Sequence, residues 1–551
     1  MKITTEERTR LNQVLAELRL ERYPFWHLWR ELADYILPKR YVWLRTDRER
    51  RVRQAKNPYI LDSTGTGAAR VLASGLMNGI TSPSRPWFKI RVPGNFDLGG
   101  PVTQWCDEVE RRMLYIMSMS NFYNGMAVLY LDLVVFGSAS MLIYEDNETV
   151  IRCYNPALGE FYFGQGYRLT VEVFGREFRQ TARQLVDRFG IDNVSDTVKN
   201  MYKNGGATTL KEVDVCQLIE PNNDGKSSVP KKFKYRETYW EVGRQADEVL
   251  QQRGFNEMPG IFPRWELTAN DSYGTSPSMD ALSDIIQLQQ ETKRKAQAID
   301  KTINPPIIAD IQLAQRPTAL LPNGITYVAG SNNIGAKPLY QIDPPIQELT
   351  ADIKDVQQRI QARLYNDLFN SISNLDTVRS ATEIDARREE KLILLGSVLE
   401  RFENEALDPA VQRIFAIMNR FGLIPPAPPQ IQGHSIQISY ESILSTAQRA
   451  VSAAPTERWL GLIGNIAGLV PDVRNIPDFY GLLTDYGLNI GVPAKNMVSR
   501  DQYNQAIAAE QQQQQDAAQA QNALAATQGA KNLGDTEVGG GANALQMLMA
   551  Q

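Results

Sequence analysis

The stretch between residues 276 and 420 most constrains the fold, because its pattern predicts two long helices joined by a compact module. Ser276 and Pro277 form a helix start, since serine caps the first turn and proline fits the first helical position. This helix is predicted to run to residue 304, where consecutive prolines stop it. The return helix, 346–369, carries an apolar row whose spacings of three and four place it on one face: Leu349, Ile353, Val356, Ile360, Leu364 and Leu368. Each helix would span about 35–40 Å at about 1.5 Å per residue.

A hairpin with one narrow apolar row per helix cannot bury enough surface to be stable alone, so it needs neighbours. Two arrangements satisfy this need. Identical hairpins could form a ring around a water-filled tunnel, or the hairpin could be an ordinary antiparallel pair packed on the globular body. The residues between the helices, 305–345, contain two short β-like runs and too little volume for an independent core.

The totals bound the class of protein. The chain has 551 residues, which predicts two to four domains, and a net charge of -4. Near-neutrality argues against a tight nucleic-acid binder, although it permits a protein past which DNA slides. Three widely spaced cysteines form no metal or disulfide pattern, which favours a reducing compartment. The charged N-terminus does not resemble a secretory signal, and no apolar run of about 18 residues predicts a membrane span.

The remaining patterns predict an α+β body. Thr4 and Glu7 fit a capping box for a first helix, and a second helix is expected after Pro24. From residue 140 to 267 the texture changes to β-rich runs separated by glycine, proline and asparagine, which predicts a mostly antiparallel sheet. After residue 501 an alanine- and glutamine-rich tail permits either disorder or a helix that lines a tube.

The sequence shows no catalytic chemistry. Its two histidines, His27 and His434, lack the partners of a catalytic triad, and no His/Cys cluster has metal-ligand spacing. The glycines of residues 62–67 precede a helix, but no Lys-Ser/Thr pair follows as a phosphate-binding loop requires. We therefore predict no catalytic residue, no metal and no cofactor. Nucleotide hydrolysis stays as a weaker alternative.

Four passages resemble the head-to-tail connector, or portal, proteins of short-tailed bacteriophages. The most specific is ASGLMNGITSPSRPWFKI at residues 73–90, in which a small-residue helix leads to Thr-Ser-Pro and then Pro-Trp-Phe. In family order follow SNFYNGMAVLYLDLVVFGSASMLIYED at 120–146, SYGTSPSMDALSDIIQLQQ at 272–290 and RSATEIDARREE at 379–390. The resemblance covers roughly residues 10 to 425 and is weak beyond 430.

This resemblance implies the portal fold: a wing of helices and antiparallel sheet, an α-helical stem hairpin, a small α/β clip, a helical crown and a helical tail. The implied boundaries are the wing at 1–275, the first stem helix at 276–304, the clip at 305–345, the second stem helix at 346–369, a tunnel loop at 370–380, a long helix at 381–424, the crown at 425–500 and a barrel or disordered tail at 501–551.

The resemblance also implies a non-enzymatic role in the virion: a ring of about twelve copies at one capsid vertex through which DNA is packaged and ejected. Its implied partners are further copies of this chain, the terminase motor, tail proteins, major capsid and scaffold proteins, and double-stranded DNA held without sequence preference. The tunnel-loop candidates are Asn370, Ser371, Ser373, Asn374 and Arg379. The stem candidates for facing a polyanion are Lys293, Arg294, Lys295 and Lys301. The alternative is a monomeric or dimeric scaffold that uses the hairpin as a coiled coil.

Overall fold

The structure is a computed structural model that describes residues 3–38, 59–91, 101–223, 229–243, 248–268, 270–303, 307–308, 337–338, 345–367, 395–431, 437–440, 459, 463, 478, 480–483 and 500–535. The chain separates into two compact units. The first comprises residues 1–88, 111–424 and 442–444, and the second comprises residues 89–110, 425–441 and 445–551.

Helix α1 (Thr5–Tyr35) opens the first unit as one continuous helix. Its cap is as predicted, because the Thr4 hydroxyl accepts a hydrogen bond from the Glu7 N–H at 3.2 Å. The expected break at Pro24 is wrong, since the helix passes through that proline. Apolar side chains on both sides of it, such as Leu18 and Trp29, are buried, and this burial outweighs the roughly 3 kcal/mol that an internal proline costs.

A five-stranded antiparallel sheet in the order β4-β5-β6-β7-β8 forms the centre of the first unit. Its strands are β4 (Phe161–Gln165), β5 (Val171–Thr181), β6 (Glu212–Pro221), β7 (Tyr235–Glu241) and β8 (Gln251–Phe255). The predicted α+β class with antiparallel pairing is therefore confirmed at this level. Three of the β-rich runs that we expected between residues 140 and 267 correspond to β5, β6 and β7, whereas no expected run corresponds to β4 or β8.

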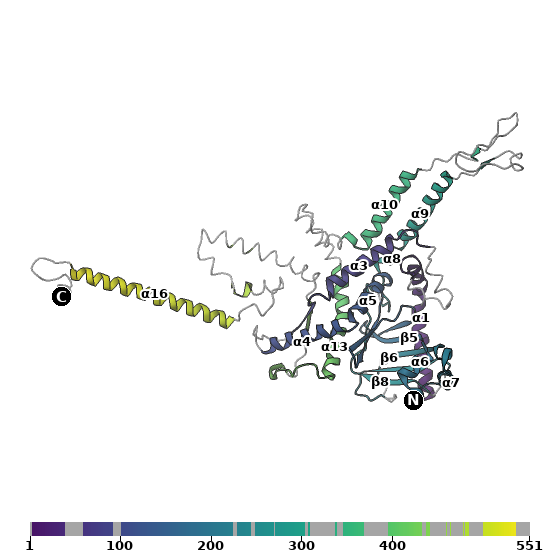
Figure 1. The fold of residues 1–551 in the computed structure, drawn as a ribbon, viewed down its shortest axis with the longest axis horizontal. Coiled ribbons are helices and arrows are strands. Elements are labelled where there is room, and N and C mark those ends of the chain that lie inside the picture. Colours follow the sequence, from purple (N-terminus) through teal and green to yellow (C-terminus); the bar gives the residue numbers. More distant parts are fainter. Residues whose placement is uncertain are drawn as a thin grey trace, which may run out of the picture. The chain divides into compact units, whose positions relative to one another are not determined.

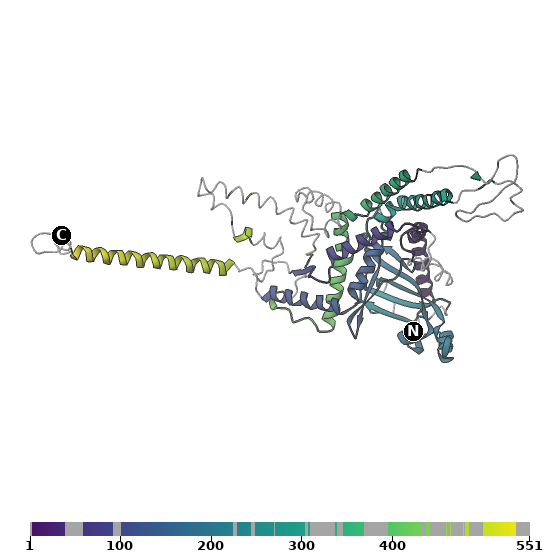
Figure 2. The ribbon, with the colours of Figure 1, turned by 45° about the horizontal axis from the view of Figure 1, so that its top comes forward.

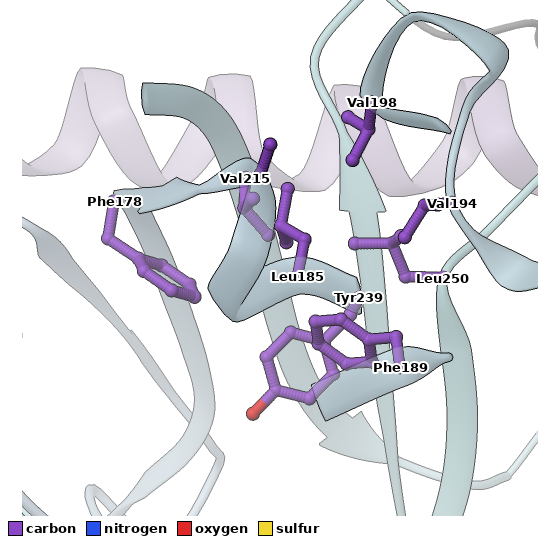
Figure 3. Close-up of a cluster of buried hydrophobic side chains, with 9 residues drawn as sticks. Phe178, Leu185, Phe189, Val194, Val198, Val215, Tyr239 and Leu250 are labelled. Carbon is purple, nitrogen blue, oxygen red and sulfur yellow. The ribbon is translucent and has the colours of Figure 1, made fainter. Parts of the chain in front are cut away.

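Each face of this sheet has its own core. On one face α1 packs through Leu11, Leu15 and Leu18 against residues that include Tyr162 and Trp240. On the other lie α6 (Ala182–Phe189) and α7 (Asp196–Lys203), with the short 3-10 turns η2 (Ile191–Asn193) and η3 (Gly206–Leu210). Figure 3 shows this second core, made of Phe178, Leu185, Phe189, Val194, Val198, Val215, Tyr239 and Leu250. The neighbours Tyr239 and Trp240 serve opposite cores because successive strand side chains alternate in direction.

A smaller antiparallel sheet, β3-β2-β9, lies within the same unit and consists of β2 (Met141–Asp146), β3 (Val150–Tyr154) and β9 (Gly260–Ile261). The helices α3 (Thr64–Ile80), α4 (Pro101–Met119) and α5 (Phe122–Phe136) precede it in sequence. At the end of α5, Gly137 adopts a φ of 74° and lies against Gly274. A Cβ on Gly137 would lie 2.2 Å from the Gly274 carbonyl oxygen. The two chain segments therefore need glycine, which has no side chain, where they cross.

The helical segment that closes the first unit contains a wide turn. Residues 395–402 are helical, a π-helix follows (η5, Glu403–Leu407), and α13 (Asp408–Arg420) continues from it. In a regular α-helix, Pro409 would clash with the carbonyl of Glu405, and the π turn removes that conflict. The same turn directs the Glu405 carboxylate to Arg264, whose guanidinium is fully buried and lies 2.7 Å away.

The second unit contains a two-stranded sheet of β1 (Phe88–Arg91) and β12 (Gln437–Tyr440), the 3-10 turn η6 (Pro429–Ile431) and the helix α16 (Arg500–Asp535). Inside it the Trp105 indole donates a hydrogen bond to the Pro425 carbonyl at 3.0 Å. Of the two states considered for the tail, the structure has a helix at 500–535.

Candidate functional site

The candidate site is a helical hairpin of the first unit. The short helix α8 (Pro277–Asp280) leads into α9 (Leu282–Ile303), and α10 (Ile346–Arg363) returns beside it (Figures 1 and 2). Ser276 caps α8 as predicted, since its hydroxyl accepts from the Met279 N–H at 3.2 Å and donates to the Val135 carbonyl at 2.8 Å. Between the helices the structure describes only the antiparallel pair β10 (Ile307–Ile308) and β11 (Lys337–Pro338).

The apolar row of α10 is buried within the single chain. Val356, Ile360 and Leu364 are fully buried, and Ile353 is 8% exposed. Leu349, nearer the tip of the hairpin, is half-buried, and Leu368 lies outside the described residues. The row therefore already has partners in its own subunit, so contacts with other molecules must use other faces of the hairpin.

Gln289 joins α9 to the segment before α3. Its side-chain oxygen accepts hydrogen bonds from the backbone N–H groups of Leu61 at 2.7 Å and Asp62 at 2.9 Å. Its side-chain nitrogen donates to the Asp62 carbonyl at 3.0 Å. One buried amide thus satisfies three backbone groups, which replaces the pairing that a strand would have supplied.

Asp62 joins the second helix of the hairpin to the same place. One carboxylate oxygen accepts from the backbone N–H and hydroxyl of Thr64, which starts α3, and the other accepts from Gln357 of α10 at 2.7 Å. Close packing supports this junction, because a Cβ on Gly65 would lie 3.0 Å from the Ile285 side chain. The expected glycine turn at 62–67 is thus the start of α3, with Gly65 and Gly67 inside the helix, and together with Asp62 it anchors both helices of the hairpin.

An ion pair links the two helices at their base. The Asp284 carboxylate, in the first turn of α9, lies 3.0 Å from Nε of Arg363 and 3.8 Å from a terminal nitrogen of Arg359. Arg363 also donates to the Asp280 carbonyl at 2.6 Å. An acid near a helix N-terminus and a base near a helix C-terminus each complement the helix dipole.

The end of α10 is set by backbone geometry. The helix was predicted to reach residue 369, but it ends at Arg363, and Tyr365 adopts a left-handed φ of 55°. A residue with a side chain in that region costs about 1 kcal/mol, and Tyr365 interrupts the helix just before the predicted tunnel loop. Loop residues Asn370, Ser371, Ser373, Asn374 and Arg379 all lie outside the described residues.

The four basic stem candidates lie in the C-terminal half of α9. Lys293, Arg294 and Lys301 are exposed, and Lys295 is half-buried. None of the four makes an ion pair with any residue in the described part of the chain.

Other kinds of site receive no support from the described residues. No group of three or more histidine, cysteine, aspartate or glutamate side chains there is arranged to hold a metal ion. None of the described helices combines the length and apolar composition that crossing a bilayer requires.

The comparisons with known proteins define the class. A family model described as "Bacteriophage head to tail connecting protein" matches residues 8–498. The portal protein of Salmonella phage epsilon15 is 38% identical over 536 residues, which is 96% of each chain. The probable portal protein of Bordetella phage BPP-1 is 36% identical over 502 residues, 90% of each chain. This chain belongs to the bacteriophage head-to-tail connecting proteins, and it functions as a portal protein.

Sequence reasoning found the hairpin but missed the residues that anchor it: Asp62, Asp284, Gln289, Gln357 and Arg363. A weak signal existed at Asp62, because aspartate two residues before a threonine often accepts that backbone N–H at a helix start. Gln289 gave no signal, since glutamines on a polar helix look alike until the fold buries one of them.

Proposed function

We propose that this portal protein works as a ring of about twelve identical subunits whose stem hairpins form the wall of a DNA channel. The observation that carries the proposal is the anchored hairpin within a chain that matches the connector family over residues 8–498. Heterologous contacts between copies, in which one surface binds a different surface of the next copy, close into such a ring when the rotation permits.

The base of the hairpin supports a load-bearing wall. Hydrogen bonds from Gln289 and Gln357, the Asp284–Arg363 ion pair and the buried apolar row all fix the two helices to the wing. We propose that the segment 305–345 at the other end of the hairpin is the clip, which binds the terminase motor during packaging and tail proteins afterwards.

We propose that the loop 370–380 narrows the channel. Its asparagines and serines, with the single cation Arg379, suit brief contacts with passing phosphates rather than tight binding. Among the stem cations, Arg294 and the half-buried Lys295 are proposed to face the same path. The mechanism involves no catalysis: the ring guides DNA, and the energy for packaging comes from the motor.

The ring is tested first by the native mass of the purified full-length chain, together with electron micrographs. We expect a particle of about twelve subunit masses with a central hole. A monomer or dimer at high concentration, both alone and with the phage scaffold protein, would contradict the ring and favour a hairpin scaffold.

The loop is tested by deleting residues 371–379. Rings should assemble normally, because the loop is proposed to face the channel, while packaging or retention of DNA in the head should fall. Normal packaging by rings of the deletion variant would remove the loop from the mechanism.

A further inference from the structure

The two helices of the stem carry unpaired charges of opposite sign. On α9, Lys293 and Lys301 are exposed and make no ion pair with any described residue. On α10, the exposed carboxylates of Glu348 and Asp352 also lack an ion pair within the described part of the chain. Arg294 and Lys295 of α9 and Lys354 of α10 likewise lack an ion pair among the described residues, whereas Asp355 pairs with Arg359.

Each pair forms a row on its helix. Glu348 and Asp352 are four residues apart, which places them on one face one turn from each other. Lys293 and Lys301 are eight residues apart and lie on a row with Gln297 between them. Arg294 is turned by about 100° around the helix from Lys293 but lies only about 20° from Lys301, so it borders the same row.

The rows lie at matching heights along the hairpin. Asp284 contacts Arg359 and Arg363, so the base of α9 at residue 284 is level with residue 361 or so of α10. Nine residues onward along α9 reaches Lys293, and nine residues back along α10 reaches Asp352, both about 13 Å above the base. By the same count Glu348 is level with residue 297, midway between Lys293 and Lys301.

We infer that these rows are the two halves of a contact between neighbouring subunits: Lys293 and Lys301 of one copy pair with Asp352 and Glu348 of the next. The inference rests on the ring proposed above. Hairpins that stand side by side around a ring keep their heights, so α9 of one copy meets α10 of the next with opposite charges opposed. The apolar row cannot supply this contact, because it is buried inside each subunit.

Such a contact sets register more than strength. Exposed ion pairs contribute little singly, but like charges across an interface are repulsive and exclude wrong alignments. With these two ion pairs at every interface, neighbouring hairpins would be held at the same height, as a smooth channel wall requires.

The test uses two reversals in the full-length chain: Lys293→Glu with Lys301→Glu, and Glu348→Lys with Asp352→Lys. Each variant alone opposes like charges at every interface, so we expect the concentration for half-assembly to rise at least about tenfold at low salt. In an equimolar mixture every interface can again join opposite charges, provided the two variants alternate. The mixture should therefore form rings with a one-to-one composition, measured by native mass spectrometry with one variant isotopically labelled. The variant carrying all four changes should also form rings.

The matched control is Lys203→Glu with Lys211→Glu, which changes net charge equally at exposed lysines of the wing and should assemble like wild type. If the wild-type chain forms rings and each charge-reversed variant alone assembles equally well, this contact is overturned while the ring stands. Normal rings of the lysine variant that lose DNA retention would also overturn the contact, since the lysine row would then face the channel. A wild-type chain that never forms rings would overturn the ring and this contact together.

Discussion

At the scale of single residues, the base of the hairpin depends on one buried amide, that of Gln289, which is hydrogen-bonded at both ends. Gln289 is 5% exposed, yet both ends of its amide are used by Leu61 and Asp62. Removing a partner from buried N–H groups costs more than the hydrogen bond itself contributes, because these groups lose water without replacement. The identity of this one side chain therefore matters more than that of its glutamine neighbours.

We predict that Gln289→Ala lowers the free energy of unfolding by about 1–3 kcal/mol, since it leaves two backbone N–H groups of the wing unpaired. Urea denaturation of the purified chain measures this change. The control is Gln290→Ala, an exposed position on the same helix, where the effect should stay within about 0.5 kcal/mol. Equal effects at the two positions would contradict the anchoring role of Gln289.

The cysteines provide a second prediction at this scale. Burial raises the pKa of the Cys153 and Cys216 thiols to about 12 and that of Cys106 to about 11. Because only the thiolate reacts with iodoacetamide, alkylation of the folded chain at pH 8 should be at least about a hundredfold slower than that of free cysteine. Denaturant should restore the ordinary rate, whereas rapid labelling of the native protein would show that these thiols are accessible.

At the scale of elements, the π turn at 403–407 couples two parts of the first unit that are distant in the sequence. It brings Glu405 to Arg264, whose backbone N–H and guanidinium both donate to the carboxylate, and the guanidinium also donates to the Leu169 carbonyl. A proline one turn later explains the wide turn, and the ion pair explains why its geometry is retained. Taken alone, the pair Asp408-Pro409 predicts only a kink or a new helix start, because the partner Arg264 is far away in the sequence.

We predict that Glu405→Ala destabilises the chain by about 3–5 kcal/mol, because it leaves the fully buried Arg264 guanidinium without a counter-charge. Thermal unfolding measures the loss. Glu400→Ala, at an exposed position earlier in the same helical segment, serves as the control and should change stability little. A loss below about 1 kcal/mol at Glu405 would show that water reaches Arg264.

At the scale of the whole molecule, the helical tail contributes little to the stability of the rest. Among the described side chains of α16, all are exposed except the half-buried Ile507. A helix that buries so little surface gains its stability from alanine-rich propensity rather than from packing. Its contacts within the described part of the subunit lie at its start, where Arg500 is 3.1 Å from Asp478 and the Tyr503 ring lies 5.1 Å from that of Tyr480.

We predict that truncation after residue 499 leaves the unfolding midpoint of the first unit unchanged within experimental error. The comparison is made with the full chain by differential scanning calorimetry. A large drop in the midpoint would mean that residues 500–551 stabilise the subunit itself.

The hairpin, the Ser276 cap, the apolar row of α10 and the antiparallel strand-rich region were all readable from the sequence, because each is encoded by periodicity or by neighbouring residues. Tertiary structure alone decided the features that depend on residues far apart in the chain. These include the passage of α1 through Pro24, the strands β4 and β8, and the early end of α10 at Tyr365. They also include the junction of Asp62, Gln289 and Gln357, where hydrogen bonds join positions more than 200 residues apart. No local pattern records such partners, because burial selects them only when the whole wing has formed.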